Sequence, residues 1–292
     1  MKTVSEELLF SLNIPKKLGL DNFNLHEAYV CLQLCQLSYL TIDTQRKILK
    51  KYKFNKFKTF SVLNTYAFIC IKNKTLFITF KGSDFTDPSD IVDNLKIEKV
   101  KEGKGKVHLG YKEHIDRIWL DLLKEISKIK FDNIIITGHS MGGAVGQIAN
   151  YRLPGTKGYY FGSARSVNST IYKNQKSFVY HIQNEYDLIT NFPPKLFFGF
   201  RLIGTRFVLK YGKLYLRPQS LFEIFYGIFY MLAFLFLLGI SKIFGIKNKM
   251  KDLLLKNHEI IYYHRNLEAY IVEESFSILR NEKKTKNIIK NM

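Results

Sequence analysis

The most telling segment of the chain reads Gly138-His139-Ser140-Met141-Gly142-Gly143, and it follows the apolar run Asn133-Ile134-Ile135-Ile136-Thr137. This run predicts a buried parallel strand, and the residues from Gly142 to about Asn150 predict a helix that leaves at once. Glycines two positions before and after Ser140 let strand and helix approach closely, because larger side chains would collide with a neighbouring element. The segment therefore predicts a nucleophile elbow that presents the Ser140 hydroxyl at the carboxyl edge of a sheet. The alternative is a glycine-rich turn in which the serine is incidental.

A candidate acid follows the serine, as the chain order of such folds requires. Residues 177–182 predict another strand, and Asp187 comes shortly after it, ahead of the stop signal Pro193-Pro194. A loop at this place would direct the Asp187 carboxylate toward an imidazole. The competing interpretation is a loop aspartate that caps a turn.

Two histidines follow Asp187 in the sequence, His258 and His264. His258 lies close to the start of a segment that is expected to pack back on the sheet, whereas His264, beside Arg265, fits a surface position. His258 is therefore the predicted general base. Together with Ser140 and Asp187 it completes a predicted catalytic triad.

Further motifs follow one another along the chain in a recognisable order. They are Phe80-Lys81-Gly82-Ser83, Asp90-Ile91-Val92-Asp93-Asn94-Leu95, Val107-His108-Leu109-Gly110-Tyr111, Phe161-Gly162-Ser163-Ala164-Arg165, Asn184-Glu185-Tyr186-Asp187 and His258 with Tyr262. With these motifs the chain, from about Asn24 to Tyr263, resembles the class 3 lipases, the α/β-hydrolases that include fungal triacylglycerol lipases. It departs from the family pattern where Lys81, Ile91 and Ala164 replace arginine, tryptophan and proline.

The resemblance implies an α/β-hydrolase fold, a mostly parallel central sheet with helices on both faces. It also implies an oxyanion hole formed by the backbone N–H groups of Ser83 and Met141. Losing one such donor typically costs about 10²–10³-fold in rate. Without the resemblance Ser83 would be read as an ordinary turn serine. His108 precedes the nucleophile and is expected to be structural.

Length and composition indicate how many domains the chain has and which partners and cofactors to expect. The 292 residues suit one domain, 1–292, with a helix from Leu25 to about Tyr39 and an edge hairpin formed by residues 200–209 and 213–216. No nucleic-acid module accompanies the +20 net charge, so no nucleic-acid partner is expected. Neither metal-ligand spacing nor a phosphate-binding loop stands out, so the sequence predicts no metal and no cofactor.

Cysteine usage and the first residues bear on location. The three cysteines, Cys31, Cys35 and Cys70, are an odd count, and residues 1–7 lack the apolar core of a secretory signal. We therefore expect an intracellular protein with reduced thiols, which is not secreted.

A second unusual segment is Ile224–Ile240, seventeen residues without a charge. As a helix it would extend about 25 Å, slightly short of the roughly 30 Å hydrocarbon layer of a bilayer. A single crossing would put Asp187 and His258, which both have to reach Ser140, on opposite sides of the membrane. We therefore expect an apolar helical insertion over 221–246 that lies on the membrane, dips in and returns, or covers the active site. A buried core helix is the alternative.

Charge favours a membrane-facing role for this region. Between Lys195 and Lys256 the chain has eleven basic residues and two acidic ones, and residues 281–292 form a basic tail. Basic residues near an anionic membrane surface contribute about 1 kcal/mol each to binding. A second basic cluster, Arg46 to Lys58, carries interleaved aromatic residues, and it reads either as part of the same surface or as a solvated face.

These features predict a serine-dependent carboxylic ester hydrolase that cleaves acyl esters of glycerolipids at a membrane surface, with an acyl lipid as substrate. A lipid acyltransferase would use the same triad. A non-catalytic membrane-binding protein on a lipase scaffold is the rival from a different class. Acyl-chain length, headgroup, position on glycerol and oligomeric state stay open.

Overall fold

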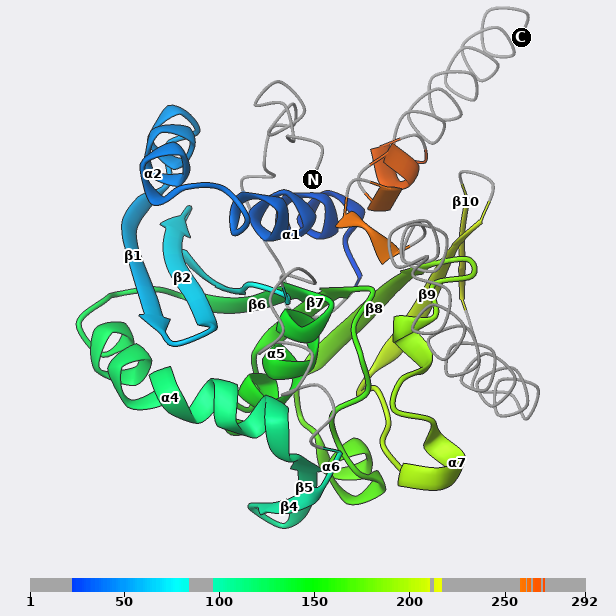
Figure 1. Cartoon of the computed structure of the whole chain (residues 1–292). Coiled ribbons are helices and arrows are strands. Elements are labelled where there is room, and N and C mark those ends of the chain that lie inside the picture. Colours follow the sequence, from blue (N-terminus) through cyan, green and yellow to red (C-terminus); the bar gives the residue numbers. More distant parts are fainter. Residues whose placement is uncertain are drawn as a thin grey trace, which may run out of the picture.

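The computed structural model describes residues 23–83, 97–210, 213–216, 258–260, 262–263, 265–268 and 270. Within these ranges one sheet has the strand order β1-β2-β3-β6-β7-β8-β9-β10, and β4 pairs with β5 in a separate small sheet (Figure 1). The strands are β1 (Asn55–Val62), β2 (Thr65–Lys72), β3 (Thr75–Phe80), β4 (Lys99–Glu102), β5 (Gly105–His108), β6 (Asn133–His139), β7 (Lys157–Phe161), β8 (Phe178–Asn184), β9 (Thr205–Lys210) and β10 (Lys213–Leu216).

The centre of the large sheet is parallel. β3, β6, β7, β8 and β9 pair in parallel, whereas the flanking pairs β1–β2, β2–β3 and β9–β10 are antiparallel. The register sets Phe80 opposite Gly138, and Phe161 opposite both His139 and Ile182. The loops that follow four neighbouring strands therefore meet at one carboxyl edge, where ligands of such sheets bind. The mostly parallel sheet confirms the predicted fold class.

Helices cover both faces of the sheet. Figure 1 shows α1 (Leu25–Leu37) on one side and α4 (Leu109–Ile126) and α5 (Met141–Arg152) on the other. Neighbouring residues of β6 show how the sheet is buried between them: Ile135 joins the core around α1, and Ile136 joins the core around α4 and α5. Alternation of side chains along a strand produces this two-sided burial. The remaining helices are α2 (Ile42–Lys51), α6 (Ser169–Asn174) and α7 (Lys195–Phe198).

The predicted elements around the motifs are present, with small shifts at their ends. The strand predicted before Ser140 runs on to His139, and the helix predicted from Leu25 ends at Leu37. The edge hairpin is confirmed as β9 and β10, but β9 begins at Thr205 and not at Phe200. Gly204 precedes it with a φ of +78°, a backbone conformation that favours glycine, so the chain turns there before it joins the sheet.

Several predicted features lie outside the described residues. They are the apolar insertion 221–246 with Ile224–Ile240, the basic tail 281–292, the motif Asp90–Leu95, and His264. Among the helices that the structure describes, none combines the length and the hydropathy needed to cross a bilayer.

A buried ion pair fastens α1 to the sheet. The Nζ of Lys157, the first residue of β7, lies 2.6 Å from a carboxylate oxygen of Glu27 in α1, and both side chains are fully buried. The Tyr159 hydroxyl donates to the same oxygen at 2.8 Å. A buried charge is tolerated only while its partner is present, so the pair fixes where α1 lies on the sheet.

The variant Lys157→Met is expected to lower the free energy of unfolding by about 3–5 kcal/mol, because it leaves the Glu27 carboxylate buried without a cation. Urea unfolding followed by circular dichroism measures the change. The double variant Glu27→Gln/Lys157→Met should recover much of the loss. Equal stability of the single variant and the wild type would contradict this account of the pair.

Candidate active site

Ser140 occupies a strained turn between β6 and α5. Its φ is +58° and its ψ is −126°, a conformation that a residue with a side chain rarely adopts. The turn places the serine at the first residue after β6 and at the start of the following helix. This is the geometry of the nucleophile elbow that the sequence predicts.

The glycines of the elbow are required by close packing. A Cβ on Gly138 would overlap the backbone of Gly142 and lie 2.7 Å from the nitrogen of Gly143. A Cβ on Gly142 would lie 2.8 Å from the carbonyl carbon of Lys81, in the loop after β3. Backbone atoms cannot move aside for such a group. The strand, the helix and the β3 loop therefore meet only because these positions have no side chains.

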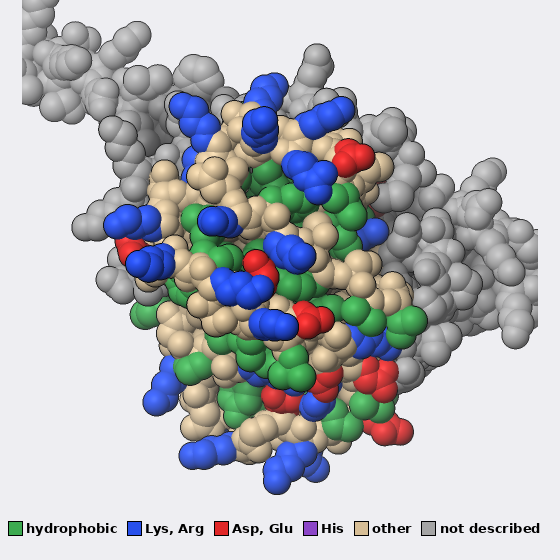
Figure 2. Space-filling model, turned by 90° about the vertical axis from the view of Figure 1, so that its left-hand side faces the viewer, with side chains coloured by type: hydrophobic (Ala, Val, Ile, Leu, Met, Phe, Trp, Pro, Cys, Tyr) green, Lys and Arg blue, Asp and Glu red, His purple; other side chains and the backbone are tan. Residues whose placement is uncertain are grey.

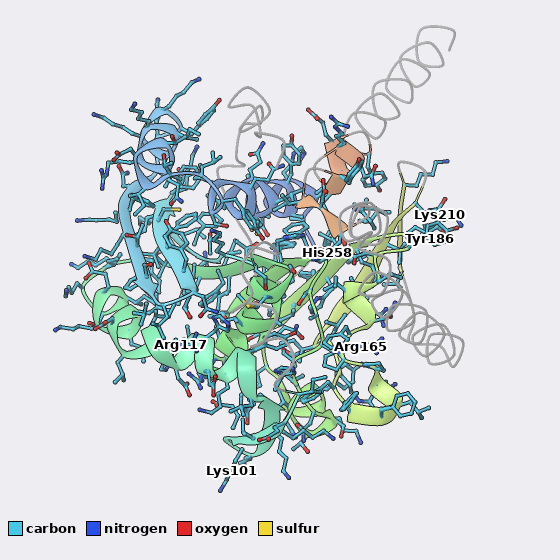
Figure 3. All side chains as sticks on the ribbon, viewed as in Figure 1. Lys101, Arg117, Arg165, Tyr186, Lys210 and His258 are labelled. Atoms are coloured by element: carbon cyan, nitrogen blue, oxygen red, sulfur yellow. The ribbon has the colours of Figure 1, made fainter. Side chains whose placement is uncertain are left out.

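The three residues predicted as a triad meet at this elbow. The Oγ of Ser140 lies 2.8 Å from Nε2 of His258, and Nδ1 of His258 lies 2.9 Å and 3.0 Å from the two carboxylate oxygens of Asp187. All three side chains are buried. Figure 3 shows His258 over the sheet, near the centre of the molecule. The arrangement suits proton transfer from the serine to an imidazole that a carboxylate orients.

The loop after β8 holds the Asp187 carboxylate in place. The backbone N–H of Ile189 donates to Oδ1 at 3.0 Å, and the Tyr263 hydroxyl donates to Oδ2. The Thr190 hydroxyl donates to the backbone carbonyl of Asp187 at 2.8 Å. The carboxylate is therefore fixed from several directions before it receives the imidazole N–H.

Tyr263 is a site residue that the sequence motifs did not identify, since the tyrosine that matches the family's histidine motif is Tyr262. Besides donating to Asp187, the Tyr263 oxygen accepts the backbone N–H of Asn184 at 3.0 Å. Burial, and then the charge of Asp187, raise the pKa of Tyr263 well above its ordinary value. The hydroxyl therefore stays protonated and remains a donor to the acid.

Gly162 offers a test of the acid–histidine contact. It follows β7 with a φ of +55°, and a Cβ there would lie 2.8 Å from Oδ2 of Asp187 and 3.0 Å from Nδ1 of His258. We expect Gly162→Ala to lower kcat for a soluble ester by about 10²-fold, because displacing catalytic groups by about 1 Å costs that much. Steady-state kinetics measure the effect. The control Gly155→Ala, where a Cβ would meet nothing within 4 Å, should leave kcat unchanged. Equal kcat in both variants would contradict the expected crowding.

The residues predicted for the oxyanion hole lie together beside the serine. Ser83 and Met141 are both buried, and the Ser83 hydroxyl lies 3.3 Å from the Met141 sulfur. A Cβ on Gly82 would lie 2.5 Å from the His139 carbonyl and 3.2 Å from the Ser140 Cβ, so the β3 loop passes directly against the elbow. The structure thus brings the two residues predicted for the oxyanion hole next to the nucleophile.

Other residues named from the sequence lie outside this group. His108 is buried and stacks on Tyr111, with ring centroids 4.1 Å apart, in keeping with a structural role. Lys81, which replaces the family arginine, lies with its Nζ 5.5 Å from the centroid of the Tyr39 ring. Among the described residues, His, Cys, Asp and Glu form no group of three that could hold a metal ion.

Comparison with known proteins agrees with the geometry. Residues 77–197 match the family described as lipase (class 3), and no curated protein matches significantly. Similar structures include Rhizomucor miehei triacylglyceride lipase, at 21% identity and a TM-score of 0.53 over 63% of this chain and 80% of that one. Lipase II from Rhizopus niveus aligns at 21% identity with a TM-score of 0.52, covering 66% of this chain and 80% of that one.

A third similar structure is a triacylglycerol lipase whose catalytic centre is described as a serine protease triad. It is 21% identical, with a TM-score of 0.52 over 63% of this chain and 78% of that chain. At such identities the structural similarity shows the fold, and the family match adds the sequence motifs. Residues 77–197 therefore match the class 3 lipase family, a family of ester hydrolases, and the chain shares its fold with fungal lipases.

Proposed function

We propose that this protein is a serine-dependent lipase that hydrolyses acyl esters of glycerolipids at a membrane surface. The observation that carries the proposal is the continuous chain of contacts from Ser140 Oγ through the His258 ring to the Asp187 carboxylate. A strained, buried serine held against an imidazole activates a hydroxyl for attack on a carbonyl. A non-catalytic binding protein has no use for this geometry.

The proposed reaction follows from the positions of these groups. Nε2 of His258 takes the Ser140 proton as the hydroxyl oxygen attacks the ester carbonyl, and Asp187 stabilises the imidazolium that forms. The backbone N–H groups of Ser83 and Met141 stabilise the negative charge on the carbonyl oxygen. His258 then gives its proton to the leaving alcohol, and water, activated by the same imidazole, hydrolyses the acyl-enzyme.

The contact between His258 and Asp187 bears on membrane attachment. The apolar segment Ile224–Ile240 lies between these residues in the sequence, and both act on one serine. Such a segment suits an in-plane anchor, a re-entrant hairpin or a cover over the site, and not a single crossing. We propose a monotopic or re-entrant attachment on this basis.

A basic face supports an anionic surface as the partner. Between residues 41 and 75 the chain has nine basic residues and one acidic residue, Asp43. Figure 2 shows Lys and Arg side chains spread over the side of the molecule where α2, β1 and β2 lie, with apolar side chains and a smaller number of Asp and Glu side chains between them. On α2 the residues Ile42, Arg46 and Lys47 are exposed. Anionic headgroups would attract this face.

An intracellular location is part of the proposal. Cys31, Cys35 and Cys70 are all free thiols within the hydrophobic core. Burial raises the pKa of the Cys35 thiol to about 12, so it is an unreactive thiol and not a redox-active one. Buried reduced cysteines suit a reducing compartment.

Product analysis tests the function and separates hydrolysis from acyl transfer. Purified protein is incubated with vesicles of mixed neutral and anionic glycerolipids, and the products are identified by mass spectrometry. Hydrolysis predicts free fatty acids together with deacylated lipids. Acylated alcohols without free fatty acid would instead assign acyl transfer. If vesicles bind but no product forms, the protein is a non-catalytic binder and the proposal is wrong.

Deleting residues 222–244 with a short linker is expected to separate membrane attachment from chemistry. The variant keeps every group of the triad, so it should hydrolyse a water-soluble short-chain ester at a rate near that of the wild type. Hydrolysis of lipid in bilayers should fall much further, because the enzyme loses its hold on the interface. High salt should weaken the residual vesicle binding through screening of basic residues. Undiminished bilayer hydrolysis would contradict the anchoring role.

A further inference from the structure

The proposed general base is packed against a second imidazole. His139, the last residue of β6, stacks on His258 with ring centroids 4.8 Å apart and an angle of 28° between the planes. Its Nε2 lies 2.8 Å from the backbone carbonyl oxygen of His258, and its Nδ1 lies 3.0 Å from the Tyr39 hydroxyl. None of these contacts takes part in the acyl-transfer steps.

The partners of His139 determine its tautomer. A carbonyl oxygen only accepts hydrogen bonds, so Nε2 carries the proton and donates it to His258. Nδ1 is then the acceptor for the Tyr39 O–H. Burial, followed by the nearby charge of His258, lowers the pKa of His139 well below its ordinary value, which keeps the ring neutral.

The sequence distance of His258 from its partners explains why its backbone needs such support. His258 is 118 residues from Ser140 and 71 residues from Asp187 in the chain. The two hydrogen bonds of its ring orient the imidazole, but they hold it at the serine only if the main chain is also fixed. The bond from His139 attaches the main chain of His258 to the residue directly before the nucleophile.

We propose that His139 is a positioning residue for the reaction. Its Nε2–H bond to the His258 carbonyl and the stacking of the two rings hold the His258 imidazole against Ser140. The Tyr39 hydroxyl, by donating to Nδ1, holds the His139 ring in the orientation from which Nε2–H can donate. A neutral ring on the face of His258 is also compatible with the imidazolium that forms during attack, because a π face tolerates a cation. The inference rests on the proposed function, since it concerns the proton transfer from Ser140 to His258.

Two substitutions at the same position separate the hydrogen bond from ring packing. His139→Gln offers an amide N–H near the position of Nε2, whereas His139→Phe keeps a ring and has no donor. With p-nitrophenyl acetate as a water-soluble substrate, His139→Phe should lower kcat by up to about 10²-fold with KM little changed, because misplacing a catalytic group affects the chemical step. His139→Gln should recover at least about tenfold of that loss. The rate of labelling by a fluorophosphonate probe should follow kcat.

The matched control is another buried histidine away from the site. His114 on α4 is buried, and its Nδ1 lies 2.8 Å from the Thr65 hydroxyl, a contact of the same kind as that between His139 and Tyr39. His114→Phe should lower the Tm while leaving kcat and the labelling rate unchanged. A purely structural role for His139 would give the same pattern. That result, with kcat of His139→Phe close to the wild-type value, would overturn the proposal.

Tyr39→Phe tests the inference should His139→Phe fail to fold. It removes one hydroxyl and keeps the ring beside Lys81. It should lower kcat and the labelling rate by about three- to tenfold, because the His139 ring loses the hydrogen bond that orients it. Unchanged kcat in this variant would overturn the proposal. Ser140→Ala, run in parallel, separates the two claims. Hydrolysis that survives without Ser140 refutes the proposed function, whereas Ser140-dependent hydrolysis that is insensitive to His139 and Tyr39 refutes only this inference.

Discussion

Replacing Ser140 with alanine is expected to reduce kcat for ester hydrolysis by about 10⁶-fold and to abolish labelling by a fluorophosphonate probe. The substitution removes the oxygen that lies 2.8 Å from Nε2 of His258, so no covalent intermediate can form. Steady-state kinetics with a soluble ester and in-gel fluorescence of the labelled protein measure the two effects. Vesicle binding should persist, because the serine is buried and contributes nothing to the outer surface.

The alanine variant also tests whether Ser140 acts through its side chain alone. The φ of +58° at this position costs an alanine about as much as a serine, so the Tm should change little. Normal turnover by Ser140→Ala, in protein of unchanged Tm, would falsify the mechanism and return the glycine-rich turn to a structural interpretation.

Replacing His258 with alanine is expected to cause a loss of similar size, also about 10⁶-fold in kcat, since serine and base act as one unit. Without the imidazole the Ser140 proton has no acceptor, and the Asp187 carboxylate loses its contact with the ring. The measurement is kcat for a soluble ester, together with the rate of fluorophosphonate labelling. The effects of Ser140→Ala and His258→Ala should not add in the double variant.

His264→Ala is the control for this assignment, because His264 is the other histidine that follows Asp187 in the sequence. It should retain nearly all activity. If His264→Ala were inactive and His258→Ala active, the general base would be His264, and the contacts that join His258 to Ser140 would lack catalytic meaning.

Local sequence was enough to predict the elbow. Gly138 is needed by local geometry alone, because a Cβ there would meet the backbone of Gly142 and Gly143, which follow it within five residues. The order of serine, acid and histidine then limited the choice to few residues, and the structure brings Asp187 and His258 to Ser140 as that order predicts. Features fixed by chain geometry over a few residues are therefore readable without a structure.

Contacts between distant segments were not readable in this way. Tyr262 and Tyr263 are neighbours, and one residue on a helix turns a side chain by about 100°, so only the packed structure decides that Tyr263 contacts Asp187. Lys157 begins β7, and a lysine at the end of a strand is usually exposed. Its burial depends on Glu27, 130 residues earlier in the chain, and no sequence pattern links the two residues.

The long sequence separations within the triad have a consequence for the synthesis of the protein. Ser140 and Asp187 leave the ribosome well before His258 and Tyr263, and contacts between such distant residues form late in folding. The serine therefore has no base, and the acid lacks the Tyr263 hydroxyl, until the last of these segments has been translated and has docked. We therefore expect incomplete chains to be inactive toward esters, so that reactivity of Ser140 would report that these segments have docked.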